Sequence, residues 1–270
     1  MFEHLFVDVK RFAEIHPPTR LYARPTRPDP TQEAPVTAED GQDETSGARP
    51  LDLLDVLDMC EVVTGPGARH TEILTPEGKL GLLWDGEPGD GRVVVACSGA
   101  LGGLLGPAKG LYFDLARTLA PAGVATVRVD YRRPGDLPAC ILDAAVAVDL
   151  AERVGGARFV VVGHSFGGAV AVGAGASLPE HVVAVATLAT QSAGCQPVTE
   201  LRDLPLLFVH GDADTIVPAS SSAMVQGIAG HGELVVVPDA GHLLNECADD
   251  LRARLPRWIL AALAGTPTPF

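Results

Sequence analysis

The chain has 270 residues, of which 47% are hydrophobic and 20% charged, and its formal net charge is −14. This composition predicts a soluble globular protein long enough for one large core. The negative charge argues against nucleic acid and anionic membrane surfaces as partners, because both repel it. No apolar run reaches 18 residues, so we expect no membrane-spanning helix.

The N-terminus and the cysteines bear on localisation. Glu3 and Asp8 stand where a secretory signal peptide needs an unbroken apolar core. The five cysteines are odd in number and form neither a C-x-x-C pair nor a zinc-binding pattern. Such cysteines are typical of reduced thiols rather than of a disulfide framework. We therefore expect a cytoplasmic protein.

Residues 1–60 predict an N-terminal extension ahead of the main domain. Apolar residues near helical spacing predict a short amphipathic helix over 1–15, which either packs on its own domain or docks on a second subunit or other partner. Seven prolines between residues 16 and 50 are typical of an extended or disordered linker. The run LDLLDVLDM, residues 51–59, predicts a short surface helix.

From residue 61 the chain alternates between strand-like and helical runs, which predicts one domain over 61–265. The strand-like runs are 69–74, 79–84, 92–97, 124–129, 158–163, 181–188, 205–210 and 233–237. The helical runs are 109–121, 137–154, 166–177, 219–229 and 247–263.

The strand-like runs are of two kinds. The first two are joined by Pro76-Glu77-Gly78, a turn signal that predicts a hairpin. Later runs, such as RVVVAC and RFVVVG, are continuously apolar, as expected of parallel strands buried on both faces. The alternation predicts an α/β fold with a mostly parallel eight-stranded sheet and helices on both faces. Active sites in such sheets lie at the carboxyl ends of the strands.

The run GHSFGG, residues 163–168, comes directly after a strand-like run and opens an apolar helix of small residues. In this context the pattern G-x-S-x-G forms a sharp strand-to-helix turn that exposes the serine. Glycines two residues before and after Ser165 let the chain turn without Cβ clashes. We therefore predict Ser165 as a nucleophile, near the positive end of the helix.

A serine hydroxyl needs an adjacent base, and that base needs an acid to fix its tautomer. His242 follows the last strand-like run, so it can reach a serine at another strand end. The run HGDADTIVP, residues 210–218, offers two carboxylates after the preceding strand. We choose Asp214 as the acid and assign Asp212 to hydrogen bonds with backbone N–H groups of the turn.

The motifs GHSFGG, HGDADTIVP and AGH, each after an apolar strand, resemble those of the α/β-hydrolase superfamily over residues 61–263. The resemblance implies a serine hydrolase domain and places the triad acid at the D of G-x-x-D-x-x-V-P, which is Asp214. Members with bulky or lipid substrates often insert a cap after the sixth strand, but the gap at residues 190–203 is too short for one. We therefore expect a lidless member with no inserted cap domain, open on that side unless residues 1–60 cover it.

The resemblance also implies an oxyanion hole. One donor is the backbone N–H after the nucleophile, here that of Phe166. The other comes from the loop after the third strand, which reads CSGALGG. Many relatives have His-Gly where this chain has Ser98-Gly99, but a backbone donor does not depend on that side chain. We predict the N–H of Ala100 as the second donor.

Three further residues are predicted to line the substrate site: Gly99 and Leu101 of the same loop, and His164 within the elbow. His210, which ends a strand, is another candidate for this lining. The hypothesis is an enzyme that cleaves a carboxylic ester or thioester of a small-molecule acyl substrate through an acyl-enzyme, with no cofactor and no metal. Two alternatives stay open: a small peptidase or amidase of the same fold, and a noncatalytic binding protein on this fold.

Overall fold

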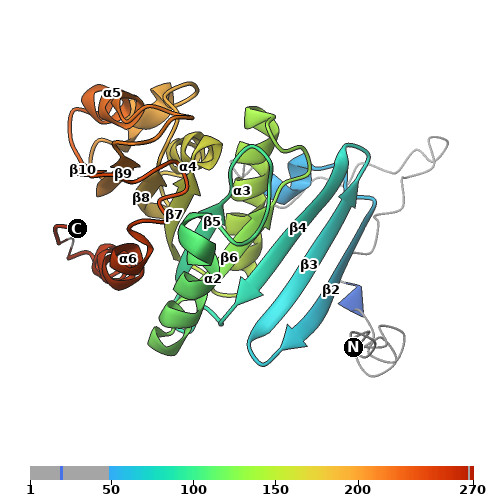
Figure 1. Cartoon of the computed structure of the whole chain (residues 1–270). Helices are drawn as coiled ribbons and strands as arrows, with labels where there is room; N and C mark the ends of the chain where they lie inside the picture. The colour runs from blue at the N-terminus through green and yellow to red at the C-terminus, as the bar shows by residue number, and fades with distance from the viewer. Residues whose placement is uncertain (1–18, 21–48, 267) are drawn as a thin grey trace, which may run out of the picture.

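The computed structural model describes residues 19–20, 49–266 and 268–270 (Figure 1). The strands are β1 (Thr19–Arg20), β2 (Asp58–Gly65), β3 (Ala68–Thr75), β4 (Gly78–Asp85), β5 (Arg92–Cys97), β6 (Ala125–Asp130), β7 (Arg158–His164), β8 (Val182–Leu188), β9 (Leu206–Gly211) and β10 (Glu233–Val237). The α-helices are α2 (Pro107–Leu119), α3 (Leu137–Arg153), α4 (Phe166–Ser177), α5 (Ser220–Ala229) and α6 (Ala248–Leu263). Three 3-10 helices are η1 (Pro50–Leu53), η2 (Ala120–Ala122) and η3 (Gln196–Leu201).

The strands of the described residues form one sheet in the order β1-β2-β3-β4-β6-β5-β7-β8-β9-β10. Neighbouring strands from β6 to β10 are parallel, whereas those from β1 to β6 along this order are antiparallel. The prediction of an α/β fold with a mostly parallel sheet is confirmed, but the predicted count of eight strands is wrong, because the sheet of the described residues has 10 strands and is antiparallel from β1 to β6. The sequence DMCEVVTG of β2 mixes polar with apolar residues and lacks the continuous apolar run of the central strands.

The hairpin predicted at Pro76-Glu77-Gly78 is confirmed, since β3 and β4 pair antiparallel with Thr75 opposite Gly78. The five helices predicted from residue 109 onward are also present, with ends within two residues of those expected. One of them begins irregularly. Ala108, Lys109 and Gly110 have φ angles of 52°, 59° and 96°, so regular helix in α2 starts only after this left-handed turn.

The chain ahead of β2 differs from the prediction. The surface helix expected over 51–59 is wrong, because only η1 is helical and Leu51 and Leu54 are buried in the core. The boundary expected after residue 60 falls within β2. The helix predicted over 1–15 and most of the linker predicted over 16–50 lie outside the described residues.

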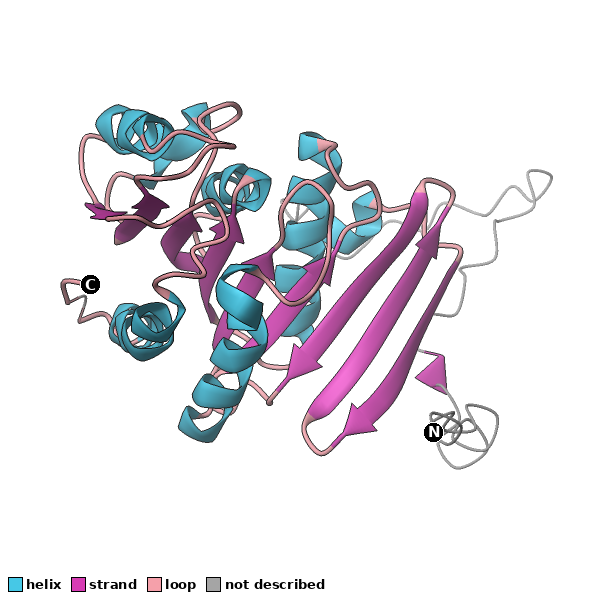
Figure 2. Cartoon of the chain, viewed as in Figure 1, coloured by secondary structure: helices cyan, strands magenta, loops and turns pink. Residues whose placement is uncertain are grey.

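Two apolar cores lie on the two faces of the sheet, and β5 shows how one strand serves both. Val93 and Val95 belong to the core under α3 and α4, whereas Val94 and Ala96 belong to the core under α2 and α6. Helices accordingly cover both faces of the central strands, while β2, β3 and β4 extend to one side as a meander (Figures 1 and 2). Burial on both faces explains the unbroken apolar runs of the parallel strands.

The carboxyl ends of β5, β7, β9 and β10 point to one edge of the sheet, because these strands are mutually parallel. The predicted site residues lie in the loops that leave these strands, except His164, the last residue of β7, and Phe166, the first residue of α4. The segment between β8 and β9, residues 189–205, contains η3 as its regular element. None of the helices in the described part of the chain combines the length and apolar character needed to cross a lipid bilayer.

Candidate active site

Ser165 occupies a strained turn between β7 and α4. Its backbone has φ 55° and ψ −118°, a conformation that costs a residue with a side chain on the order of 1–3 kcal/mol. The flanking glycines make this turn possible. A Cβ at Gly163 would lie 1.9 Å from the carbonyl oxygen of Gly167, and a Cβ at Gly167 would lie 2.3 Å from that of Cys97. Only glycine fits at either position, as the motif predicts.

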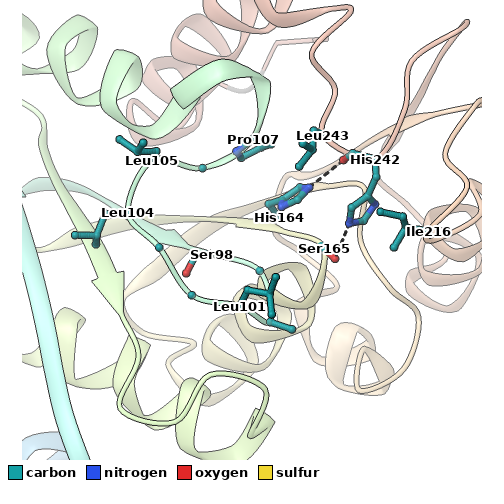
Figure 3. Close-up of a pocket in the computed structure, with 15 residues that line it drawn as sticks. Ser98, Leu101, Leu104, Leu105, Pro107, His164, Ser165, Ile216, His242 and Leu243 are labelled. Carbon is teal, nitrogen blue, oxygen red and sulfur yellow. Dashed lines mark hydrogen bonds between the residues drawn. The ribbon is translucent and has the colours of Figure 1, made fainter.

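His242 lies in the loop between β10 and α6, next to the serine. Its Nε2 is 3.0 Å from Ser165 Oγ (Figure 3). Its Nδ1 is 2.7 Å from Asp214 Oδ2. Nδ1 therefore donates to the carboxylate, which leaves the Nε2 lone pair to accept from the serine hydroxyl. The three side chains, from three separate loops, have the geometry of a nucleophile, a general base and an orienting acid.

The second oxygen of Asp214 is held by its own loop. Oδ1 accepts hydrogen bonds from the backbone N–H groups of Ile216 and Val217, at 2.8 and 2.9 Å. Burial by itself would raise the pKa of this carboxyl, but the hydrogen bonds from His242, Val217 and Ile216 outweigh burial and lower the pKa. Asp214 therefore stays ionised beside His242.

Asp212 lies away from His242, although it is only two residues from Asp214. It is exposed, and its Oδ1 accepts a hydrogen bond of 2.7 Å from the backbone N–H of Asp239. This contact joins the loop after β9 to the loop after β10, which carries His242. The structure thus brings Asp214, and not Asp212, to the imidazole.

His210 contacts Asp214, the predicted acid, and does not border the cavity beside Ser165. The side chain is fully buried, and its Nε2 lies 3.1 Å from Asp214 Oδ2 and 2.9 Å from the carbonyl oxygen of Val217. Both oxygens are acceptors, so Nε2 carries the hydrogen, and Nδ1 faces Ser222 Oγ at 2.6 Å. Asp214 Oδ2 consequently receives one hydrogen bond from each of two histidines. The sequence position of His210 near the end of β9 predicts that it lies close to the site, but it does not predict the hydrogen bond with Asp214.

His164 holds the loop of His242. Its Nε2 lies 3.0 Å from the backbone carbonyl oxygen of His242, and the two rings have centroids 4.9 Å apart. Since a carbonyl oxygen only accepts, Nε2 of His164 donates and Nδ1 keeps a lone pair. Burial lowers the pKa of His164 to about 4, so this imidazole is neutral near neutral pH.

The two predicted oxyanion donors come from the first residue of α4 and from the loop after β5. Phe166 is the first residue of α4, and its N–H has no intrahelical acceptor because of that position. Ala100 is exposed in the loop after β5, and none of the described residues accepts a hydrogen bond from its N–H. Neither N–H therefore has an acceptor among the described residues, while the Phe166 ring itself is buried against Tyr131.

The loop between β5 and α2, residues 98–106, is fixed at several points, beginning at Cys97, the last residue of β5. The hydroxyl of Tyr112 donates to the carbonyl oxygen of Cys97 at 2.9 Å, and that of Tyr131 to the carbonyl oxygen of Ser98 at 3.3 Å. Farther along, Arg128 donates to the Leu104 carbonyl oxygen at 3.3 Å. These anchors hold the Ala100 amide in place, which a preorganised oxyanion site requires.

A cavity of about 640 Å³ opens beside the serine. It is lined by residues 98–107 together with His164, Ser165, Ile216, His242 and Leu243. No Asp, Glu, Lys or Arg is among these residues, and Leu101, Leu105 and Ile216 are largely exposed around the opening (Figure 3). The arrangement fits an uncharged ligand with apolar parts.

The predicted lining residues Gly99, Leu101 and His164 all border this cavity. Ile216 and Leu243 also border it, although sequence reasoning did not select them. Their positions in the sequence could have indicated this, because Ile216 lies two residues after Asp214 and Leu243 lies one residue after His242. Among the described residues, no group of three or more His, Cys, Asp and Glu side chains could hold a metal ion.

No family model and no curated protein sequence matches the chain. Solved structures do match. Est1E from Butyrivibrio proteoclasticus superimposes with a TM-score of 0.62 at 19% identity, over 74% of this chain and 100% of that one. A dienelactone hydrolase from Anabaena variabilis gives 0.60 at 18% identity, over 73% and 100%. An α/β serine hydrolase homologue from Coxiella burnetii gives 0.57 at 21% identity, over 70% and 95%. Likeness at these identities concerns the fold.

Proposed function

We propose that this chain, which has the α/β-hydrolase fold, is a serine hydrolase that cleaves carboxylic esters through an acyl-enzyme intermediate. One observation carries the proposal: Ser165 Oγ, His242 and Asp214 Oδ2 form a continuous hydrogen-bonded relay, with distances of 3.0 and 2.7 Å. A buried ion pair or a packing contact needs no serine hydroxyl at the end of such a relay. The relay also borders a cavity, where a substrate can reach it.

In the acylation step, His242 Nε2 takes the proton of Ser165 as Oγ attacks the ester carbonyl carbon. The carbonyl π electrons move to oxygen, and the N–H groups of Ala100 and Phe166 stabilise this oxyanion. The intermediate collapses as the bond to the alkoxy oxygen breaks, and His242 gives its proton to the departing alcohol. Water then repeats the sequence on the acyl-enzyme and releases the acid.

Asp214 has an orienting role in this mechanism. Its acceptance of the Nδ1 hydrogen keeps the Nε2 lone pair on the serine, and its charge stabilises the imidazolium that forms in each step. The low pKa of Asp214 supports this role, since the carboxylate stays ionised throughout the working pH range.

The cavity supports a neutral, largely apolar acyl substrate, since no formally charged side chain borders it. The short segment 189–205 supports a site without an inserted cap domain. A thioester would react by the same steps. For the cell, we propose a cytoplasmic location, supported by five cysteines that are all free.

A fluorophosphonate probe tests the proposal directly. We expect covalent labelling at Ser165, found by mass spectrometry of the tryptic peptide, and none in Ser165→Ala. Ser165→Ala should lose at least about 10⁴-fold in kcat on chromogenic esters of graded acyl length while its melting temperature is unchanged. A chain that resists the probe and binds esters without turnover would be a noncatalytic binding protein. Turnover of anilides in preference to esters would make it an amidase.

A further inference from the structure

The cavity contains one buried hydroxyl that has no partner. Ser98 is 4% exposed, and none of the described residues forms a hydrogen bond with its Oγ. Two other buried polar atoms share this property, Arg69 Nη2 and Thr126 Oγ1, but neither residue borders the cavity beside Ser165. A buried hydroxyl without a partner is unfavourable, so its retention at a ligand cavity points to the ligand.

The backbone of Ser98 is locked where it lies. Its carbonyl oxygen accepts from Tyr131 at 3.3 Å, and a Cβ at Gly167 would come within 2.4 Å of the same oxygen. Figure 3 shows the side chain inside the curve of the loop 98–106, on the same side of Ser165 as Leu104 and His164. These contacts leave rotation about the Cα–Cβ bond as the main freedom of this hydroxyl.

His164 supplies a second polar atom on this side of the cavity. Its Nε2 hydrogen is committed to the carbonyl oxygen of His242, so Nδ1 presents a lone pair. No residue in the described part of the chain donates to Nδ1. The atom faces the loop, because a Cβ at Gly99 would lie 3.7 Å from it. The apolar cavity therefore has one acceptor and one hydroxyl on the same side of the serine.

We propose that Ser98 Oγ and His164 Nδ1 form a polar subsite that binds a hydroxyl group on the acyl chain of the substrate. The inference rests on the ester hydrolysis proposed above and specifies its substrate class. A hydroxyl group matches both atoms, because it donates to the Nδ1 lone pair and accepts from the Ser98 hydroxyl. A carboxylate does not match, since Nδ1 has no hydrogen for it and no cationic side chain borders the cavity.

The test compares ethyl hexanoate with its monohydroxylated relatives, one hydroxyl position at a time, by titrating the released acid. In the wild-type protein, kcat/KM should be at least about fivefold higher for one hydroxyl position than for the plain ester. Ser98→Ala should reduce this ratio to about one. The methyl ethers of the same alcohols, which cannot donate to Nδ1, should show no advantage in the wild-type protein.

The melting temperature of Ser98→Ala serves as the control, and it should equal or exceed that of the wild type, because the substitution removes an unpartnered buried hydroxyl. A ratio that is unchanged in Ser98→Ala, or a wild-type preference for the plain ester over every hydroxylated one, overturns the subsite while ester hydrolysis stands. Absence of turnover on all these esters, with no labelling of Ser165, overturns the proposed function instead. Calorimetric titration of Ser165→Ala with the plain and hydroxylated esters measures binding at the subsite without turnover. Equal affinities for the two kinds of ester would overturn the subsite.

Discussion

The two halves of the sheet differ in how much strain they contain. In the antiparallel meander β2–β4, cross-strand contacts are of ordinary kinds, such as the ion pair of Lys79 with Glu72 and the hydrogen bond from Trp84 to Thr71. Among the described residues, every non-glycine residue with positive φ lies outside this meander: Ala108 and Lys109 at the irregular start of α2, and Ser165, Ala189, Asp239 and Leu244 in loops. Such conformations persist only where surrounding contacts hold them.

Those contacts are the ones that build the candidate site. Ala108 donates to the carbonyl oxygen of Leu243, and Asp239 donates to Asp212, so strained residues hold the loops beside His242. The meander widens the sheet and covers the core without contributing a residue to the cavity. Strain and reactive groups therefore occur together at the carboxyl ends of the parallel strands, as expected for loops that must place several side chains at one point.

The largest expected contrast compares one histidine in each half. His242→Gln should lower kcat by about 10⁴-fold or more, because the serine loses its base. His70→Gln, in β3 of the meander, should change kcat by less than about twofold, since His70 lies outside the cavity. Steady-state kinetics on a chromogenic ester measure both. Comparable losses in the two variants would contradict the assignment of the reaction to the parallel half.

Glycine substitutions sharpen the contrast in packing. Gly167→Ala places a Cβ 2.3 and 2.4 Å from two backbone carbonyl oxygens, and we expect losses of about 3 kcal/mol in unfolding free energy and about 100-fold in kcat/KM. Gly65→Ala in β2 has nothing within 4 Å of the new Cβ, so its unfolding free energy should shift by less than about 0.5 kcal/mol. Urea denaturation measures the unfolding free energy of both variants, and steady-state kinetics measure kcat/KM. If Gly167→Ala kept the wild-type values of both, the close packing of the turn at Ser165 would be refuted.

The buried His164 should make folding sensitive to acid. Burial lowers the pKa of His164 from 6.5 to about 4. Between these pH values the imidazole is protonated in the unfolded chain but not in the native state. The contribution of His164 to the free energy of unfolding is therefore complete above pH 6.5 and decreases as the pH falls toward 4. The total decrease is roughly 3 kcal/mol. In urea titrations between these pH values, His164→Gln should flatten the dependence of unfolding free energy on pH. Gly65→Ala, which removes no titratable group, should keep the wild-type slope.

The smallest expected effect concerns His210, which we propose as a positioning residue. His210→Asn should lower kcat by about tenfold, because Asp214 loses one charge-assisted donor. The loss should fall on kcat and leave KM within about twofold of the wild type, because Asp214 does not border the cavity. Ser222→Ala keeps the contact of His210 with Asp214, so it should lower the melting temperature and change kcat by less than about twofold. An equal loss of kcat in the two variants would leave His210 a purely packing role.

Local patterns alone determined much of this protein. The apolar runs located the central strands, small residues and strand ends located Ser165, and the order of motifs separated His242 from the other histidines. These features depend on a few neighbouring residues, and their physical causes, burial on both faces and room for a sharp turn, are local. The strand count failed at β1, which has two residues, and at β2, whose mixed residues take their pairing from β3 rather than from a pattern of their own.

Only the tertiary structure decided which polar atoms meet. It gave Asp214 two histidine donors, turned Asp212 toward Asp239, and left the Ser98 hydroxyl without a partner inside the cavity. Hydrogen bonding requires distances and directions between atoms from separate loops, and residue spacing along the chain does not specify these. The sequence therefore located the proposed nucleophile and its proposed base, and the packing of four loops at one sheet edge determined the surroundings in which they would act.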